Sequence, residues 1–200
     1  DRVGPLRPIA VAITGSIGAG KSEALRAFAR HGAAVVSSDE IVHHLLHEDE
    51  DVKLALVERF GEDALGADGR PDRGRIGRLV FGDPEALAFL EGLLHPLVAR
   101  EYLAWREQLA QLPEPPKVCV TEVPLLYEVG GESRFDKVVV VTAPPKLRDA
   151  RRKVARDDRD ARLISDEEKA KRADFVYVNT GSLEDLDAWV VGVLGELTSE

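Results

Sequence analysis

The stretch IAVAITGSIGAGKS, residues 9–22, decides the fold of this protein. An apolar run typical of a buried strand, residues 9–14, leads directly into GSIGAGKS, residues 15–22, which fits the phosphate-binding loop pattern G-x-x-x-x-G-K-[ST], or P-loop. Residues 21–31 then have the pattern of a helix. In such a unit the glycines let backbone N–H groups face phosphate oxygens, and the helix N-terminus presents its positive dipole to the same anion. The stretch therefore predicts a site for nucleotide phosphates.

The residues of this loop have separate expected tasks. Lys21 should reach the β- and γ-phosphates, and Ser22 should bind Mg²⁺. We therefore expect ATP to bind at Gly15, Gly18, Ala19, Gly20, Lys21, Ser22 and Glu23. A dinucleotide loop of the form G-x-G-x-x-G does not fit, because the glycines are spaced three and then two residues apart. A glycine-rich turn without a ligand remains the alternative.

Five apolar runs alternate with helical patterns along the chain: IAVAIT, AAVVSS, KVCVTEV, DKVVVVTA and DFVYVN. Alternation of this kind predicts an α/β fold with a five-stranded parallel sheet that helices cover on both faces. We expect helices over residues 21–31, 51–60, 84–112, 145–158, 166–173 and 182–197, with Ser182 capping the last. Pro96 lies inside the longest pattern and should kink or split that helix.

Composition limits the class of protein. The chain of 200 residues, 44% of them hydrophobic, allows one full-sized core with appendages. Its net charge of −9 opposes a sequence-independent grip on nucleic acid. We find no apolar membrane span or secretory signal, so we expect a cytoplasmic protein. Cys119, inside an apolar run, is expected to be a buried, inert thiol.

Two carboxylates are candidates for chemistry at the carboxyl ends of the strands, where ligands bind in open α/β sheets. Asp39 follows the second run and should lie beside the P-loop, one strand over, where it could act as general base; it could equally cap a helix beginning at Glu40. Glu122 closes the third run and could hold Mg²⁺ through water, or pair with an arginine. The chain lacks the D-x-x-G and N-K-x-D motifs of a regulatory GTPase.

Taken together, the motifs resemble those of one family, the dephospho-CoA kinases. The segments that carry the resemblance are AITGSIGAGKS, HGAAVVSSDEIVHHL, FGDPEALAFLEGLLHPLV, VCVTEVPLLYE, FDKVVVVTAP and KAKRADFVYVNTGSLEDL. The resemblance implies an adenylate-kinase-like core over residues 8–200, after an N-terminal extension of residues 1–7. It further implies an acceptor-binding insertion within residues 40–112 and an arginine-bearing lid within residues 146–170.

The same resemblance implies a reaction and a set of site residues. ATP with Mg²⁺ would be the phosphoryl donor, and the ribose 3′-hydroxyl of dephospho-CoA the acceptor. Asp39 takes the general-base position, although Ser37 replaces the first aspartate of the family's D-A-D motif. The matching acceptor residues are His95, Pro96, Pro124, Leu125, Leu126 and Glu128. Asn179 would lie near the nucleotide base, and Arg152 and Arg156, with Arg162 behind them, would contact phosphate.

Several of these assignments have structural alternatives. His95 could be an ordinary structural histidine, and Leu125 and Leu126 could belong to the core. The arginine-rich stretch could be a solvated helix. Within enzymes, another small-molecule kinase acting on a nucleoside, nucleotide or sugar acid is the competing function. A nucleotide-dependent binding protein with slow ATPase activity is the competing class outside the kinases.

Overall fold

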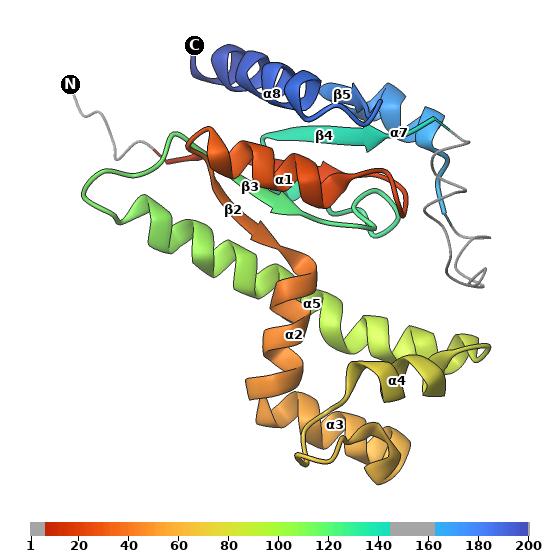
Figure 1. Ribbon diagram of the computed structural model, residues 1–200. Coiled ribbons are helices and arrows are strands. Elements are labelled where there is room, and N and C mark those ends of the chain that lie inside the picture. Colours follow the sequence, from red (N-terminus) through yellow and green to blue (C-terminus); the bar gives the residue numbers. More distant parts are fainter. Residues whose placement is uncertain (1–6, 145–162, 200) are drawn as a thin grey trace. The chain divides into compact units, whose positions relative to one another are not determined.

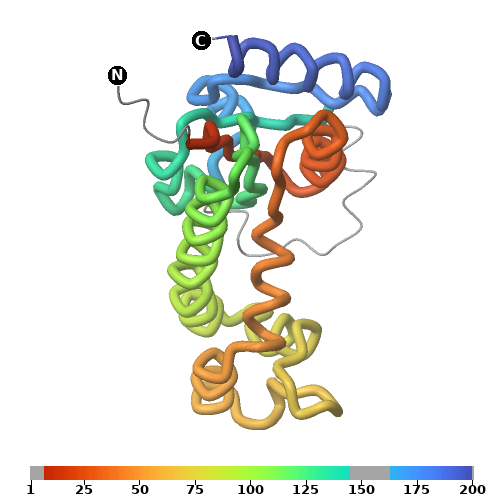
Figure 2. The backbone as a smooth tube through the Cα atoms, turned by 90° about the vertical axis from the view of Figure 1, so that its left-hand side faces the viewer, coloured from red at the N-terminus to blue at the C-terminus, as the bar shows by residue number. Residues whose placement is uncertain are grey.

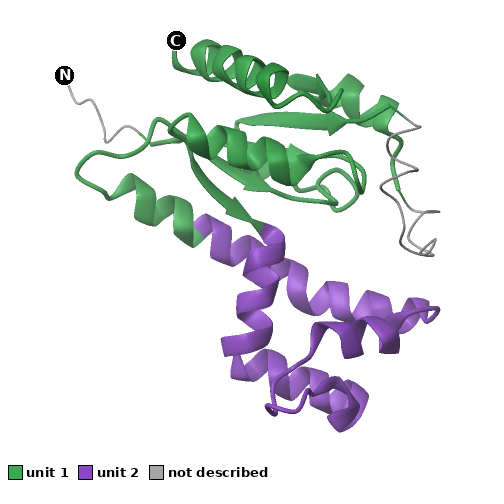
Figure 3. Ribbon diagram, viewed as in Figure 1, with its two compact units in different colours: residues 1–37, 104–155, 161–200 green, residues 38–103, 156–160 purple. Residues whose placement is uncertain are grey.

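The computed structural model describes residues 7–144 and 163–199 (Figure 1). These residues form two compact units (Figure 3). Unit 1 holds residues 7–37, 104–144 and 163–199, and unit 2 holds residues 38–103. The helix expected over residues 145–158, most of the expected lid, and Arg152, Arg156 and Arg162 lie outside the described residues.

Unit 1 is built on a five-stranded, all-parallel sheet, which confirms the predicted fold class. Its strands are β1 Ile9–Thr14, β2 Ala34–Ser37, β3 Val118–Glu122, β4 Lys137–Thr142 and β5 Phe175–Val178. The strand order is β2-β3-β1-β4-β5. The expectation that β2 lies one strand from the P-loop is therefore wrong, because β3 pairs with both β1 and β2 and lies between them.

Strands β1 and β4 are buried on both faces because alternate side chains of each strand enter different apolar clusters. Val11 and Ile13 of β1 pack with helices α1 Lys21–Arg30 and α8 Leu183–Thr198, which cover one face (Figure 1). Ala12 packs on the opposite face with Leu126 and Tyr127, which follow β3. That second cluster also includes residues flanking helix α7, Asp166–Arg172.

Unit 2 is helical (Figure 2). It has its own apolar core. Its elements are α2 Ser38–Glu48, α3 Glu50–Phe60, the 3₁₀ turn η1 Gly61–Ala64, α4 Arg73–Val80 and most of α5 Pro84–Ala110. Leu46, Val52, Leu56, Ala64, Ile76 and Leu94 form the buried centre of this core. Helix α4 was not predicted, because RGRIGRLV contains two glycines, which disfavour a helix interior.

Helix α5 continues through Pro96 for 27 residues, so the proline does not split it. Apolar contacts on either side of Pro96, from Leu93, Leu94 and Leu97, hold the helix despite the lost backbone hydrogen bond. Among residues 7–144 and 163–199, no helix combines the length and the apolar character that crossing a bilayer requires.

The environment of Cys119 leads to a testable prediction. Burial in the interior strand β3 raises the pKa of the Cys119 thiol to about 11. The reactive thiolate is therefore scarce at pH 8, and modification of the folded protein should be at least about a hundredfold slower than that of an exposed cysteine with an ordinary pKa near 8.5. The measurement is the rate of reaction with a thiol-specific disulfide reagent at pH 8, before and after unfolding in urea. Fast reaction of the folded protein would contradict the buried placement.

Candidate active site

The P-loop, residues 15–22, joins β1 to α1 and has the geometry of a phosphate cradle. Gly15 follows β1 with φ +151°, and a Cβ atom there would lie 2.2 Å from the main-chain oxygen of Val141. Gly20, with φ 100°, forms the N-cap of α1 in the left-handed region that glycine favours. The loop can therefore fit closely against β4 while its N–H groups and the start of α1 stay available to an anion.

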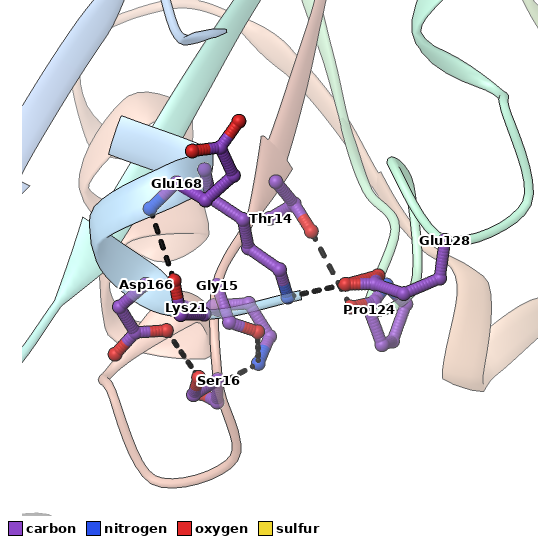
Figure 4. Close-up of polar contacts among 10 residues, drawn as sticks. Thr14, Gly15, Ser16, Lys21, Pro124, Glu128, Asp166 and Glu168 are labelled. Carbon is purple, nitrogen blue, oxygen red and sulfur yellow. Dashed lines mark hydrogen bonds and ion pairs between the residues drawn. The ribbon is translucent and has the colours of Figure 1, made fainter. Parts of the chain in front are cut away.

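Lys21 is hydrogen-bonded to the main chain at the start of the P-loop. Its Nζ atom donates to the carbonyl oxygens of Gly15 at 2.9 Å and Ser16 at 3.0 Å (Figure 4). The residue is only 9% exposed, although it is charged. These bonds hold the ammonium group within the P-loop, where the predicted contact with nucleotide phosphates requires it.

Asn179, which is far from the P-loop in the sequence, is hydrogen-bonded to it. Its Nδ2 atom donates to the carbonyl oxygen of Ala19 at 3.1 Å, and its Oδ1 atom accepts from the N–H of Gly181 at 2.9 Å. The N–H of Asn179 donates to the carbonyl oxygen of Thr142, at the end of β4. The side chain thus links the P-loop to the turn between β5 and α8. Its expected contact with the nucleotide base stays a prediction.

Replacing Asn179 with aspartate should weaken nucleotide binding. The change keeps the side-chain shape but substitutes a carboxylate oxygen for the N–H₂ group that faces the Ala19 carbonyl. A buried acceptor facing an acceptor costs roughly 1–3 kcal/mol, so the free energy of unfolding should fall by that amount and the KM for ATP should rise. Urea denaturation and ATP titrations measure both quantities. An unchanged KM would show that this bond does not hold the loop in its binding form.

Glu122 and Ser22 are the groups that could hold Mg²⁺. Glu122 is the last residue of β3, is 5% exposed and is in register with Ile13 of β1 and Ser37 of β2. Ser22 is exposed in the first turn of α1. One carboxylate and one hydroxyl suit Mg²⁺ in kinase sites, where phosphates and water supply the remaining ligands. Both residues therefore fit the predicted metal, and their role stays a prediction.

Asp39 lies in unit 2, in the first turn of α2. Because α2 begins at Ser38, Asp39 is not the N-cap of a helix that starts at Glu40, so that alternative is wrong. Its Oδ1 atom lies 3.0 Å from Nη2 of Arg73, the first residue of α4, and the two side chains are 60% and 58% exposed. An exposed pair of this kind orients the carboxylate while contributing about 1 kcal/mol or less to stability. The carboxylate stays accessible to a ligand.

The residues expected near the acceptor have varied surroundings. Leu126 is fully buried in the second apolar cluster of unit 1, so its side chain belongs to the core. Leu125 and Pro124 are half-buried, and the carbonyl oxygen of Pro124 accepts from Thr14 Oγ1 at 3.3 Å (Figure 4). In unit 2, burial lowers the pKa of His95, against an opposing effect of Glu91, and this favours the neutral imidazole.

Sequence reasoning missed three charged groups at these sites: Arg73, Asp166 and Lys169. The Asp166 carboxylate accepts a hydrogen bond from the hydroxyl of Ser16 in the P-loop. Lys169 Nζ lies 2.7 Å from Glu128 Oε1, and this ion pair is buried. The only signal in the sequence was a lysine in a short polar helix, which ordinarily indicates a solvated face. Glu128 is paired with that lysine, and its expected contact with the acceptor stays a prediction.

The parallel sheet and the P-loop at the carboxyl end of β1 define a nucleotide-binding protein with the fold of the P-loop kinases. The model of the family "CoaE: Dephospho-CoA kinase" matches residues 9–185. The dephospho-CoA kinase of Thermus thermophilus is 39% identical over 96% of this chain and 93% of that protein. That of Frankia casuarinae is 36% identical over 94% of this chain and 82% of that protein. This chain belongs to the dephospho-CoA kinase family.

Solved structures agree with this family. A crystal structure of a protein from Thermus thermophilus has a TM-score of 0.75 at 38% identity and covers 96% of this chain and 100% of its own. The dephospho-CoA kinase from Campylobacter jejuni has a TM-score of 0.68 at 29% identity, covering 97% of this chain and 100% of its own. Shikimate kinase from Aquifex aeolicus, at 13% identity with a TM-score of 0.55 and 96% of this chain covered, shares the fold alone.

Proposed function

We propose that this protein transfers the γ-phosphoryl group of ATP to the ribose 3′-hydroxyl of dephospho-CoA, giving CoA and ADP. One observation carries the proposal: a chain of the dephospho-CoA kinase family holds Lys21 within an intact phosphate cradle at the end of β1. Phosphoryl transfer depends mainly on positioning and on neutralising charge, so a rigid cationic cradle is the feature that this reaction needs most.

The donor side of the reaction is assigned to the P-loop. N–H groups of residues 15–22 and the N-terminus of α1 bind the phosphate oxygens of ATP, and Lys21 bridges the β- and γ-phosphates. Ser22 and Glu122 would hold Mg²⁺, Glu122 through water; when bound, this ion neutralises charge on the β- and γ-oxygens. Phosphate contacts by Arg152 and Arg156 of the expected lid remain part of the proposal.

The acceptor side is assigned to residues that follow β2 and β3. Asp39 accepts the proton of the 3′-hydroxyl while that oxygen forms a bond to the γ-phosphorus. The bond from the γ-phosphorus to the β–γ bridging oxygen breaks, and ADP leaves with the electron pair. Contacts to the acceptor come from Pro124, Leu125 and, in unit 2, His95 and Pro96.

An ADP-release assay with and without acceptors tests the proposal. ADP should form with dephospho-CoA and Mg²⁺, and mass spectrometry should show that the acceptor has gained one phosphate. Release that another nucleoside, nucleotide or sugar acid stimulates, and dephospho-CoA does not, would overturn the assignment. Slow release that no acceptor stimulates would indicate a nucleotide-dependent binding protein. We also propose a cytoplasmic site of action, where ATP is supplied and the single thiol of Cys119 stays reduced.

A further inference from the structure

Helix α7, Asp166–Arg172, contacts both the P-loop and the loop that follows β3, residues 123–131. The Asp166 carboxylate accepts from the Ser16 hydroxyl of the P-loop (Figure 4). Lys169 Nζ lies 2.7 Å from Glu128 Oε1, at the far end of the loop after β3. The guanidinium of Arg172 lies over the ring of Tyr127, 5.7 Å from its centre. One short helix therefore bridges the two loops at the carboxyl ends of β1 and β3.

Burying the charged pair of Lys169 and Glu128 costs desolvation free energy. The two side chains are 2% and 9% exposed. Within the part of the chain that the structure describes, neither carboxylate oxygen of Glu128 has a hydrogen-bond partner of good geometry, so its burial is compensated by the ion pair alone. Buried pairs of this kind commonly stabilise a protein no better than apolar side chains of the same size. Stability alone therefore does not account for these residue types.

The rest of the loop after β3 is already fixed. The N–H of Val123 donates to the carbonyl oxygen of Ile13 at 2.9 Å, and Thr14 Oγ1 donates to that of Pro124, so the beginning of the loop is tied to β1. Leu126 and Tyr127 are buried in the second apolar cluster of unit 1. Among the described residues, Glu128 adds a charged contact that joins the loop to the helix that also binds Ser16.

We propose that Lys169 and Glu128 are positioning residues, which hold the loop after β3 in register with the P-loop through α7. The inference rests on the proposed function, because it assigns Pro124 and Leu125 of that loop to the acceptor. In this proposal neither charge acts directly on the reacting atoms. Their effect is on the distance between donor and acceptor, to which the rate of transfer is sensitive: a displacement of about 1 Å can cost a hundredfold.

The double variant Lys169→Met/Glu128→Leu tests the proposal, because it removes both charges while keeping similar volumes. The single variants leave one charge buried without its partner and should lower the melting temperature. The double variant should regain most of that loss, yet kcat/KM for dephospho-CoA should stay about tenfold to a hundredfold below wild type, with the KM for ATP nearly unchanged. Hydrogen exchange in residues 123–131 should be faster than in wild type. Lys171→Met, on the exposed side of the same helix, is the matched control.

A double variant with wild-type kcat/KM and wild-type exchange would show that the pair is structural only, and would overturn the proposal. Should the double variant not fold, Lys169→Arg gives the answer, because arginine keeps the charge but differs in shape and reach. Positioning predicts a lower kcat/KM for dephospho-CoA at a nearly unchanged melting temperature, and wild-type kinetics would overturn it. A failure of the proposed function is distinguishable, since the wild type itself would then release no ADP in response to dephospho-CoA, while the exchange measurement would still report on the loop.

Discussion

Replacing Lys21 with alanine is expected to lower kcat by about a hundredfold or more. The ammonium group lies within the P-loop and is proposed to bridge the β- and γ-phosphates, where its contact strengthens as charge develops during transfer. Such contacts are typically worth about 3 kcal/mol or more in transition-state stabilisation. The same side chain also bonds the carbonyl oxygens of Gly15 and Ser16, so the free energy of unfolding should fall by roughly 1–3 kcal/mol.

The measurement combines steady-state kinetics with urea denaturation. Lys117→Ala is the matched control, because Lys117 is an exposed lysine just before β3, at the opposite edge of the sheet from the P-loop. It should leave kcat unchanged. Loss of a few kcal/mol leaves a domain of ordinary stability folded, so a fall in kcat can be separated from unfolding. Near-normal turnover of a folded Lys21→Ala protein would contradict the role of the P-loop as a phosphate cradle.

The second large effect is expected from Asp39→Asn. If the carboxylate takes the proton of the acceptor hydroxyl, its loss should lower kcat with dephospho-CoA by a factor on the order of 10² to 10⁴. The KM for ATP should change little, because Asp39 is assigned to the acceptor. Stability should also change little: Asn keeps the size of the side chain, and the exposed pair with Arg73 contributes about 1 kcal/mol or less. Kinetics with both substrates and a thermal melt provide the test.

Two further variants separate the general base from the ion pair. Arg73→Ala breaks the same pair but leaves the carboxylate, so its effect on kcat should be much smaller than that of Asp39→Asn. Glu40→Gln removes the neighbouring exposed carboxylate in the first turn of α2 and should have almost no effect. If Asp39→Asn turned over at close to the wild-type rate, the catalytic assignment would have to be withdrawn and only the P-loop assignment would stand.

The features that could be predicted from the sequence are those that local pattern encodes. Strands β1, β3 and β4 are continuous apolar runs because they are buried on both faces, and the P-loop is a contiguous motif between a strand and a helix. The order of the strands in the sheet, by contrast, is not encoded by any local pattern in the sequence. Nothing between Ser37 and Val118 indicates that β3 enters the sheet between β1 and β2, so the neighbour of the P-loop strand was wrongly assigned.

The polar contacts of the site could not be predicted from the sequence, because they too depend on residues that are far apart in the chain. Ser16 and Asp166 are 150 residues apart, and Asn179 and Ala19 are 160 apart, so no periodicity connects them. Lys169 looked like a solvent-exposed residue in a helix with the sequence DEEKAKR, yet it is buried because α7 lies against the loop after β3. The pairing of Asp39 with Arg73 likewise depends on how α2 and α4 fold within unit 2.

The insertion of unit 2 between β2 and β3 affects how the chain can fold and vary. Because β3 pairs with β1 as well as β2, the centre of the sheet closes only after the whole insertion has been spanned. The entropy of closing such a connection grows only logarithmically, by about 0.6 kcal/mol for each doubling of its length. Unit 2 forms its own apolar core, so apolar burial within that unit offsets the conformational entropy that its residues lose on folding. A helical unit inserted in this way can therefore grow, shrink or change sequence during evolution at little cost to the sheet that carries the P-loop.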